Sequence, residues 1–421
     1  MHQKIIRCLL FLFMLMASSL SFADWPNWRG PDGSGTTSVG QYPSQLDASN
    51  LKWKFPLPGK GCSTPAVFNQ TIYITTPDSG FDALIALDQS GKKLWSVRFD
   101  KESPGKHRNG SGSNPSPAVD SSGIYVYYKS GTLACVSPDG LVRWTTNLVD
   151  RFGKDTLFWD HGTSPILTKD HVIMTRMHQG DSWIAAFEKS SGEIAWKTPR
   201  NYETPTECDH GYTTPLVISF NDRQSILTWG AEHVTVHDAE DGELLWSCGK
   251  FNPERNKLWP AIATPVIVND TAVICFGRND RGLPQMHGVK ISGSEDNLKD
   301  DHRWVRDDAS SFVPSPISYQ GKVYLVRDRG EVECLDPDTG QTVWSGQFPK
   351  SRSNFYATPL IAAGKLYAAR EDGVVFVAEI KQQGMEVLSE NRMQQSVISS
   401  PVPTNNSILI RGEKELQCFK R

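Results

Sequence analysis

Two copies of an Asp-His-Gly triplet are the side chains best suited to carry chemistry in this sequence. They are Asp160-His161-Gly162 and Asp209-His210-Gly211, and each comes shortly before a Ser-Pro or Thr-Pro step. Together with His107, they could supply imidazole nitrogens and carboxylates to a transition metal or to general acid-base catalysis. The alternative is structural, because Asp and His also cap turns and Gly permits a tight bend. We favour the structural role and assign no residue as catalytic or as a metal ligand.

The Ser-Pro and Thr-Pro steps recur eight times and define the architecture. Their prolines are Pro65, Pro117, Pro165, Pro215, Pro265, Pro316, Pro359 and Pro401. The intervals of 42 to 52 residues are too regular for chance and too short for separate domains, so the chain consists of internal repeats. Each repeat holds short β-branched and aromatic runs separated by Gly, Asp and Pro turns. This pattern predicts an all-β fold, an eight-bladed β-propeller with four-stranded blades.

The eighth repeat, which begins at Ser400, ends before its fourth strand. Residues 51–55, ahead of the first repeat, have the pattern of the missing strand. We therefore predict that this N-terminal strand completes the last blade and closes the ring, so that no sheet edge stays open between the termini.

Tryptophan ends the fourth strand of most repeats, and cysteine recurs in the third. The tryptophans are Trp95, Trp144, Trp196, Trp246, Trp304 and Trp344. An indole buries a large apolar surface, so we predict that each packs against the next blade. Cys135, Cys334 and Cys418 share one position that is alanine in other repeats. That position is predicted to be a small buried site.

The loops that precede each first strand meet at one end of a propeller channel, where we place the binding site. In this chain they are rich in charged, amide and aromatic side chains. The candidate ligand-binding residues are His107, Arg108, Asn109, Trp159, Asp160, His161, Glu207, Asp209, His210, Tyr212, Trp259 and Tyr356.

The N-terminus has the pattern of a secretory signal peptide over residues 1–23, with cleavage after Ala23. We divide the rest into a leader of residues 24–50 packed on the propeller and the propeller domain of residues 51–421. Trp25 and Trp28 of the leader are predicted to pack on the propeller's flank. No later stretch has the roughly 20 apolar residues that a membrane span requires. We expect a periplasmic or secreted monomer.

The charge balance excludes one class of partner. The formal net charge is −3, and removal of Lys4 and Arg7 with the signal peptide makes it −5. A mildly acidic chain has no electrostatic reason to bind nucleic acid.

Three repeats carry a motif that identifies a family resemblance. Residues 186–196, 236–246 and 334–344 resemble the A-x-D-x-x-T-G-x-x-x-W tryptophan-docking repeat of quinoprotein (PQQ-like) propellers. The resemblance covers about residues 51–421. The leader, from Trp25 to Gly33, is similar to that of secreted PQQ-like repeat proteins of planctomycete-type bacteria. The same architecture occurs in quinoprotein alcohol dehydrogenases and in the propeller lipoprotein of outer-membrane protein assembly.

The two kinds of protein that share this architecture differ in what they bind: one binds a cofactor and the other binds proteins. Quinoprotein dehydrogenases place a vicinal disulfide against the quinone and hold calcium with a Glu/Asn/Asp set. This sequence has no Cys-Cys pair and no segment that aligns with the calcium motif, so we expect no cofactor. The assembly propeller instead uses its surface to bind other proteins.

We therefore expect a non-catalytic scaffold that binds a protein, a peptide or a glycan at the channel mouth. The alternative is an enzyme, either a PQQ- and calcium-dependent alcohol or aldose dehydrogenase or a metal-dependent enzyme at the histidine-rich mouth. Metal binding at His107, His161 and His210 would favour the metal-dependent enzyme.

Overall fold

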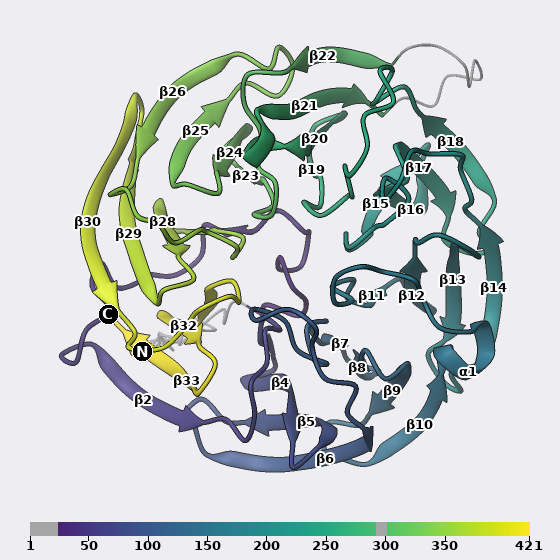
Figure 1. The fold of residues 1–421 in the computed structure, drawn as a ribbon. Coiled ribbons are helices and arrows are strands. Elements are labelled where there is room, and N and C mark those ends of the chain that lie inside the picture. Colours follow the sequence, from purple (N-terminus) through teal and green to yellow (C-terminus); the bar gives the residue numbers. More distant parts are fainter. Residues whose placement is uncertain (1–23, 292–300) are drawn as a thin grey trace, which may run out of the picture.

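Eight β-sheets surround a common axis as the blades of a propeller (Figure 1). The computed structural model describes residues 24–291 and 301–421. Seven of the sheets have four strands, and one has a fifth that comes from the leader. The fold class predicted from the sequence is confirmed. The predicted signal peptide lies outside the described residues.

The blades follow one another along the chain, and the strands of blades one to seven are hydrogen-bonded in sequence order. Blades one to four are β3 (Ala66–Phe68), β4 (Thr71–Asp78), β5 (Phe81–Leu87) and β6 (Lys93–Lys101); β7 (Ala118–Asp120), β8 (Gly123–Tyr127), β9 (Thr132–Val136) and β10 (Val142–Asn147); β11 (Ile166–Leu167), β12 (His171–Arg176), β13 (Trp183–Glu188) and β14 (Ile194–Pro199); β15 (Leu216–Phe220), β16 (Arg223–Gly230), β17 (His233–Asp238) and β18 (Leu244–Cys248). Blades five to eight are β19 (Val266–Val268), β20 (Thr271–Arg278), β21 (Leu283–Lys290) and β22 (His302–Arg306); β23 (Ile317–Tyr319), β24 (Lys322–Val326), β25 (Glu331–Leu335) and β26 (Thr342–Gln347); β27 (Leu360–Ala362), β28 (Lys365–Ala369), β29 (Val374–Lys381) and β30 (Gly384–Arg392); β31 (Val402–Thr404), β32 (Ser407–Arg411) and β33 (Glu415–Lys420) with β2 (Leu51–Pro56).

Two short helices interrupt the strand pattern. The α-helix α1 (Leu148–Phe152) starts at Asn147, whose side chain accepts the backbone N–H groups of Val149 and Asp150 and so caps the first turn. The 3₁₀ helix η1 (Asn279–Arg281) lies between β20 and β21. Among the described residues no helix has the length and apolar character needed to cross a membrane.

The ring closes through the N-terminal strand, as predicted. β2 pairs antiparallel with β33, with Trp53 opposite Cys418 and Phe55 opposite Leu416. Figure 1 shows the purple β2 on the outside of the yellow β33. The eighth blade therefore combines strands from both ends of the chain, and β2 is its fourth, outer strand.

Five tryptophans each pack against a glycine of the following blade and so join neighbouring blades: Trp53, Trp95, Trp144, Trp196 and Trp304. A Cβ added at Gly140 would lie 2.8 Å from the ring of Trp95, and one at Gly192 would lie 2.5 Å from the ring of Trp144. The indole N–H groups complete the contact by donating to acceptors on the next blade. These donations are Trp53 to Gln89 O (3.0 Å), Trp95 to Pro138 O (2.9 Å), Trp144 to Lys189 O (2.8 Å), Trp196 to Ala239 O (3.3 Å), Trp246 to Asp301 Oδ2 (3.1 Å) and Trp304 to Pro337 O (2.8 Å).

The hydrophobic core lies between neighbouring blades and is built mainly from their second and third strands. Cys135, Cys334 and Cys418 are all buried there, with 0%, 2% and 1% of their surface exposed. The prediction that they occupy small buried sites is confirmed. Because apolar burial contributes roughly 25 cal/mol per Å², the blade interfaces hold the ring together.

The leader crosses the central channel, and it does not pack on the flank where the sequence placed Trp25 and Trp28. It starts beside blades one and two. The N–H of Trp25 donates to the carbonyl of Val67 at 2.7 Å, and the carbonyl of Pro26 accepts the N–H of Val119 at 2.8 Å. Both partners belong to first strands, which lie nearest the axis.

Arg29 fixes the far end of this crossing. Its guanidinium donates to the carbonyls of Pro265 at 2.6 Å and Pro316 at 2.9 Å, in blades five and six. The chain then forms β1 (Thr36–Thr37), which pairs parallel with β27 as the innermost strand of blade seven. From there it passes blades seven and eight to reach β2, and Figure 1 shows this purple segment crossing the centre of the ring.

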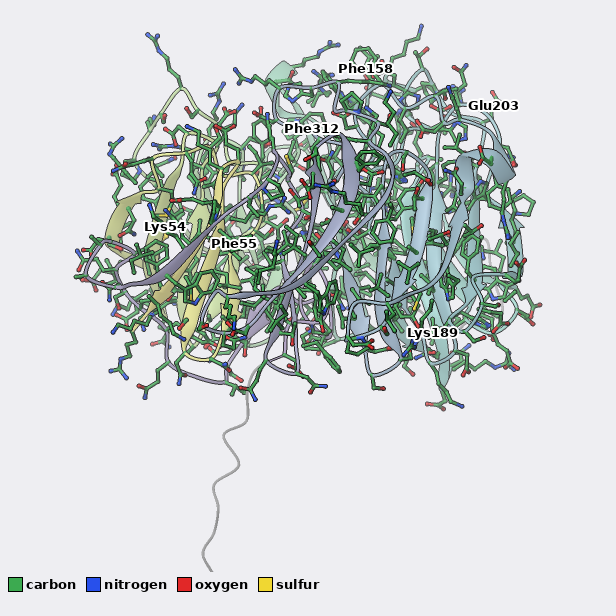
Figure 2. The ribbon with its side chains drawn as sticks, turned by 90° about the horizontal axis from the view of Figure 1, so that it is seen from below. Lys54, Phe55, Phe158, Lys189, Glu203 and Phe312 are labelled. Atoms are coloured by element: carbon green, nitrogen blue, oxygen red, sulfur yellow. The ribbon has the colours of Figure 1, made fainter. Side chains whose placement is uncertain are left out.

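The two ends of the propeller differ in the segments that they present. Figure 2 shows Phe158, Phe312 and Glu203 at the upper end, and all three belong to loops that precede first strands. Lys189, in the turn between β13 and β14, lies toward the lower end. We call the upper end the mouth face and the lower end the far face.

A candidate binding cavity at the mouth face

A cavity of about 630 Å³ lies on the axis and is lined by residues from all eight blades and from the leader. We call it the axial cavity. Its size falls within the range of roughly 300–1,000 Å³ that is usual for ligand pockets. The mouth loops supply most of the lining, and Trp28 of the leader also contributes to it. The side chains used below are Trp28, Cys62, His107, Asn109, Trp159, Asp160, Tyr212, Asp280, Phe312, Asp328, Arg329, Asn354 and Tyr356.

The Ser and Thr residues of the eight repeated steps form a closed belt around this cavity, which we call the hydroxyl ring. Its members are Thr64, Ser116, Ser164, Thr214, Thr264, Ser315, Thr358 and Ser400. In seven of them the backbone N–H donates to the hydroxyl oxygen of a neighbouring blade, at 2.9 to 3.2 Å. All eight lie nine-tenths or more out of solvent. The repeated step therefore couples the blades at the axis and lines the cavity with hydroxyl groups.

Local chemistry explains why each step consists of Ser or Thr followed by Pro. A residue before proline is held in the extended region, and proline has no N–H of its own to satisfy. The N–H of the Ser or Thr is thus the donor available at that point. A hydroxyl on the next blade is short enough to accept it without filling the channel. The sequence identified these positions as markers of the repeat but not as part of the site.

Asp160 organises the mouth loop of blade two. Its carboxylate accepts the backbone N–H groups of Lys106 and His107 and the ammonium of Lys129, the last at 2.6 Å. Burial would raise the pKa of Asp160, but the hydrogen bonds from Lys129 and from these two N–H groups outweigh it and lower the pKa. The loop approaches so closely that a Cβ at Gly110 would overlap the carboxylate. Asp160 lines the cavity as a structural anion whose acceptor sites are occupied.

The histidines of the two triplets turn away from the axial cavity. His161 and His210 are only 3% and 7% exposed, and neither lines the cavity. The ring of His161 lies edge-on to Tyr127 at 4.9 Å, and burial lowers its pKa. Gly211, after His210, bridges the main chains of Met177 and Ala261. These triplets join blades, as the structural interpretation requires.

The three predicted imidazoles do not form a metal-binding cluster. His107 alone faces the axial cavity, edge-on to Trp159 at 5.0 Å, and its Nδ1 accepts the N–H of Asn109 at 3.1 Å. Within residues 24–291 and 301–421 no group of three or more His, Cys, Asp or Glu is placed to hold a metal ion.

Half of the predicted site residues line the axial cavity. They are His107, Asn109, Trp159, Asp160, Tyr212 and Tyr356. Arg108 lines a neighbouring groove, while Trp259 is 6% exposed and packs against Phe276 in the core. His161, Glu207, Asp209 and His210 are also absent from the cavity lining.

Aromatic side chains dominate one wall. Trp159 is 42% exposed, and its backbone N–H donates to the hydroxyl of Tyr212 at 3.0 Å. Phe158, beside it, is 55% exposed and lies edge-on to the Trp159 ring at 4.7 Å, but does not line the cavity. The outer part of the mouth thus presents an aromatic pair to solvent.

A polar bridge ties the blade-two loop to blade seven. Glu371 accepts the amide of Asn109 at 2.9 Å and the guanidinium of Arg108 at 3.3 Å, and its other oxygen accepts the N–H of Asn354 at 2.9 Å. The Glu371 side chain is 11% exposed. These bonds hold the loop beside the axial cavity.

The cysteines do not recreate a quinone site. Cys62, Cys135, Cys208, Cys275, Cys334 and Cys418 are free thiols, and of the cysteines in the described residues only Cys62 lines the axial cavity. Its Sγ donates to the carbonyl of Asn109 at 2.8 Å, and burial raises the pKa of the thiol. A raised pKa suppresses the thiolate, which is the reactive form of the group.

Comparisons with known proteins place the chain in a family. A family model described as outer membrane protein assembly factor BamB matches residues 81–346. The protein of that name from Yersinia pestis is 24% identical over 331 residues, which are 77% of this chain and 75% of the relative.

Solved structures agree on the fold. BamB from Moraxella catarrhalis superposes with a TM-score of 0.61 at 15% identity, over 88% of this chain and 99% of that one. Quinohemoprotein alcohol dehydrogenase from Comamonas testosteroni gives 0.68 at 14% identity, over 94% and 80%. At such identities the likeness shows the fold alone, and these relatives give no support to a planctomycete-type source. The sequence match, in contrast, spans more than half of the chain, and the chain therefore belongs to the family described as outer membrane protein assembly factor BamB.

Proposed function

We propose that this chain is a non-catalytic scaffold of the bacterial envelope that binds a protein partner at its mouth face. Membership of a family described as an assembly factor for outer membrane proteins is the observation that carries the proposal. The expected partner is a protein that takes part in assembling the outer membrane. The predicted signal peptide supports a periplasmic or secreted location.

The exposed aromatic pair supports the mouth face as the contact surface. Phe158 and Trp159 are 55% and 42% exposed, and Trp159 packs against His107, the residue before Arg108, whose charged side chain is 73% exposed. Aromatic and Arg side chains are enriched at protein interfaces and often contribute most of the binding energy.

The arrangement of the polar groups supports a non-catalytic role. A general base must reach its substrate, yet Asp160 is occupied by three donors and His161 and His210 are buried away from the cavity. The similarity to alcohol dehydrogenases concerns fold, and a fold does not carry its activity from one protein to another.

Site-specific photocrosslinking in the native bacterium tests the proposal. A photoreactive amino acid at Phe158 should crosslink to a component of outer membrane assembly. The matched control is Leu141, which is 66% exposed in the turn between β9 and β10, the counterpart in blade two of the far-face turn that contains Lys189. Deletion of the gene should also lower the level of β-barrel proteins in the outer membrane. Equal crosslinking from both positions, with unchanged barrel levels, would overturn the proposal.

A further inference from the structure

The axial cavity has a chemical character different from that of the exposed mouth surface above it. In the described part of the chain, no protein atom accepts the proton of the seven hydroxyls that already accept an N–H from a neighbouring blade. A hydroxyl has one proton to donate in addition to its acceptor sites. The hydroxyl ring therefore presents a belt of donors that face the cavity, on side chains that are themselves nine-tenths or more buried.

Aromatic side chains complete the lining of the cavity. They are Trp28 from the leader and Trp159, Tyr212 and Tyr356 from the mouth loops. The face of an aromatic ring is electron-rich and attracts weakly positive hydrogens. The C–H groups on one face of a pyranose ring have this character, and the hydroxyl groups at its edge are acceptors as well as donors. Aromatic faces and a belt of hydroxyls thus match the two kinds of surface that a sugar ring offers.

The three carboxylates that line the cavity already have partners, and the guanidinium of Arg329, which also lines it, donates to the carbonyl of Arg352 at 2.9 Å. Asp160 accepts the ammonium of Lys129, and Asp280 pairs with Arg278 at 2.5 Å. Asp328 accepts the backbone N–H groups of Phe312 and Val313 at 3.0 and 3.2 Å. Because the three carboxylates have partners, the cavity favours an uncharged ligand over a cation.

We propose that the axial cavity binds a short neutral saccharide, with a sugar ring against Trp159 and its hydroxyl groups on the hydroxyl ring. A volume of about 630 Å³ accommodates a ligand of a few sugar residues. This assignment goes beyond the proposed protein scaffold and does not depend on it. A saccharide in the cavity would contact Trp159, which lines it, whereas Phe158, which does not line it, would stay available for protein contact.

Calorimetric titration with neutral trisaccharides tests this assignment. The probes are cellotriose, maltotriose and N,N′,N″-triacetylchitotriose, and tryptophan fluorescence provides a second readout because Trp28 and Trp159 line the cavity. At least one probe should bind with a Kd below about 10 mM and change the fluorescence. For scale, a Kd of 1 mM corresponds to a binding free energy of about −4.1 kcal/mol. Absence of binding by all three to the folded protein would overturn the proposal.

Variants locate the bound sugar. Trp159→Ala should weaken binding about tenfold, which corresponds to about 1.4 kcal/mol. The matched control is Phe158→Ala, which removes the neighbouring and more exposed ring that does not line the cavity and should change the affinity less than about twofold. Thr264→Val, which keeps the volume but removes one ring hydroxyl, should also weaken binding. Equal losses in the two alanine variants, or displacement of the sugar by an uncharged Gly-Ser peptide, would refute saccharide binding in the cavity. Photocrosslinking of the protein partner reports separately on the scaffold proposal.

Discussion

The indole ring of Trp144, in blade two, packs against Gly192 of blade three, where a Cβ would lie 2.5 Å from the ring. The same indole N–H donates to the carbonyl of Lys189 in the turn that contains the glycine, at 2.8 Å. Gly192 also has a φ of +73°, which favours glycine. The contact therefore requires glycine for two separate reasons, space and backbone conformation.

Replacement of Gly192 by alanine should destabilise the protein strongly. The added methyl group overlaps the indole and costs roughly 1–3 kcal/mol of unfolding free energy, and the left-handed backbone adds about 1 kcal/mol. Chemical denaturation measures the sum. Gly321→Ala is the control, because Gly321 has a φ of +72° with open space around it. Losses of equal size in the two variants would show that the indole contact contributes nothing.

Asp82 should make the protein less stable as the pH rises toward neutrality. The residue is completely buried, and a hydrogen bond from Ser130 only partly offsets the cost of burying its carboxylate. Burial, with Glu102 and Asp100 nearby, raises its pKa from 3.8 to about 7. The folded state therefore holds a proton that the unfolded chain loses near pH 4, so stability is greatest below that pH and falls as the pH rises to about 7. Asp82→Asn should remove a fall of about 3 kcal/mol between pH 4 and 7.

Urea denaturation across that pH range tests the Asp82 effect. The control is Asp88→Asn, in an exposed turn where the hydroxyl of Ser90 lowers the pKa of the carboxyl. This control should leave the fall in stability between pH 4 and 7 in place. A wild-type protein whose stability does not decline over this range would contradict the expected behaviour of Asp82.

The guanidinium group of Arg29 should be required to hold the leader in the channel. Its guanidinium reaches carbonyls of two blades at 2.6 and 2.9 Å, and its pKa, which burial lowers to about 9, still leaves it charged at neutral pH. A lysine ammonium lacks the planar fork that reaches both acceptors. Arg29→Lys should therefore cost about 1.5–3 kcal/mol in unfolding free energy.

The control for Arg29 is Arg98→Lys, which alters an exposed pair with Asp78 and should change stability by less than about 1 kcal/mol. In the folded Arg29→Lys variant, Trp28 should also be more accessible to a soluble fluorescence quencher than in the wild type. Unchanged quenching and stability would mean that the guanidinium fork does not hold the leader.

Glu371 should govern the mobility of the blade-two loop. Glu371→Ala removes the acceptor for Arg108, Asn109 and Asn354, so amide hydrogens of residues 107–110 should exchange faster with solvent. Arg108→Ala should have little effect, because that side chain is 73% exposed and surface ion pairs contribute about 1 kcal/mol or less. Hydrogen exchange followed by mass spectrometry separates the two variants. If exchange in this loop is the same in wild type and Glu371→Ala, the bridge does not restrain it.

Repetition explains which features were visible in the sequence. Each blade carries the same pattern, so the strands, the docking tryptophans and the completion of the last blade by Trp53 followed from comparing repeats. The leader occurs once and has no counterpart within the chain. Its route across the channel depends on Arg29 reaching two blades at once, and the sequence offers no periodic signal for such a contact.

The candidate site was predicted in part for a related reason. Repeat symmetry correctly placed His161 and His210 in equivalent loops of adjacent blades. Symmetry does not reveal which way a side chain points, and both rings are buried away from the axial cavity. The hydroxyl ring could have been recognised in the sequence. All eight steps have Ser or Thr before the proline, although many residue types are compatible with a following proline. Its role depends on the closed ring, which brings Thr64 against Ser400.

The pairing of β2 with β33 has a consequence for how the protein is made. β2 (Leu51–Pro56) and β33 (Glu415–Lys420) are far apart in sequence, so the eighth blade cannot be completed until β33 has been synthesised. During that interval β32 lacks its outer neighbour β33, and β2 has no sheet to join. Contacts this distant in sequence form slowly, and unpaired strand edges attract other chains. A chain truncated before Glu415 should therefore associate with other chains through this open blade. Pairing of the six-residue strand β33 removes the open edge and with it this route to aggregation.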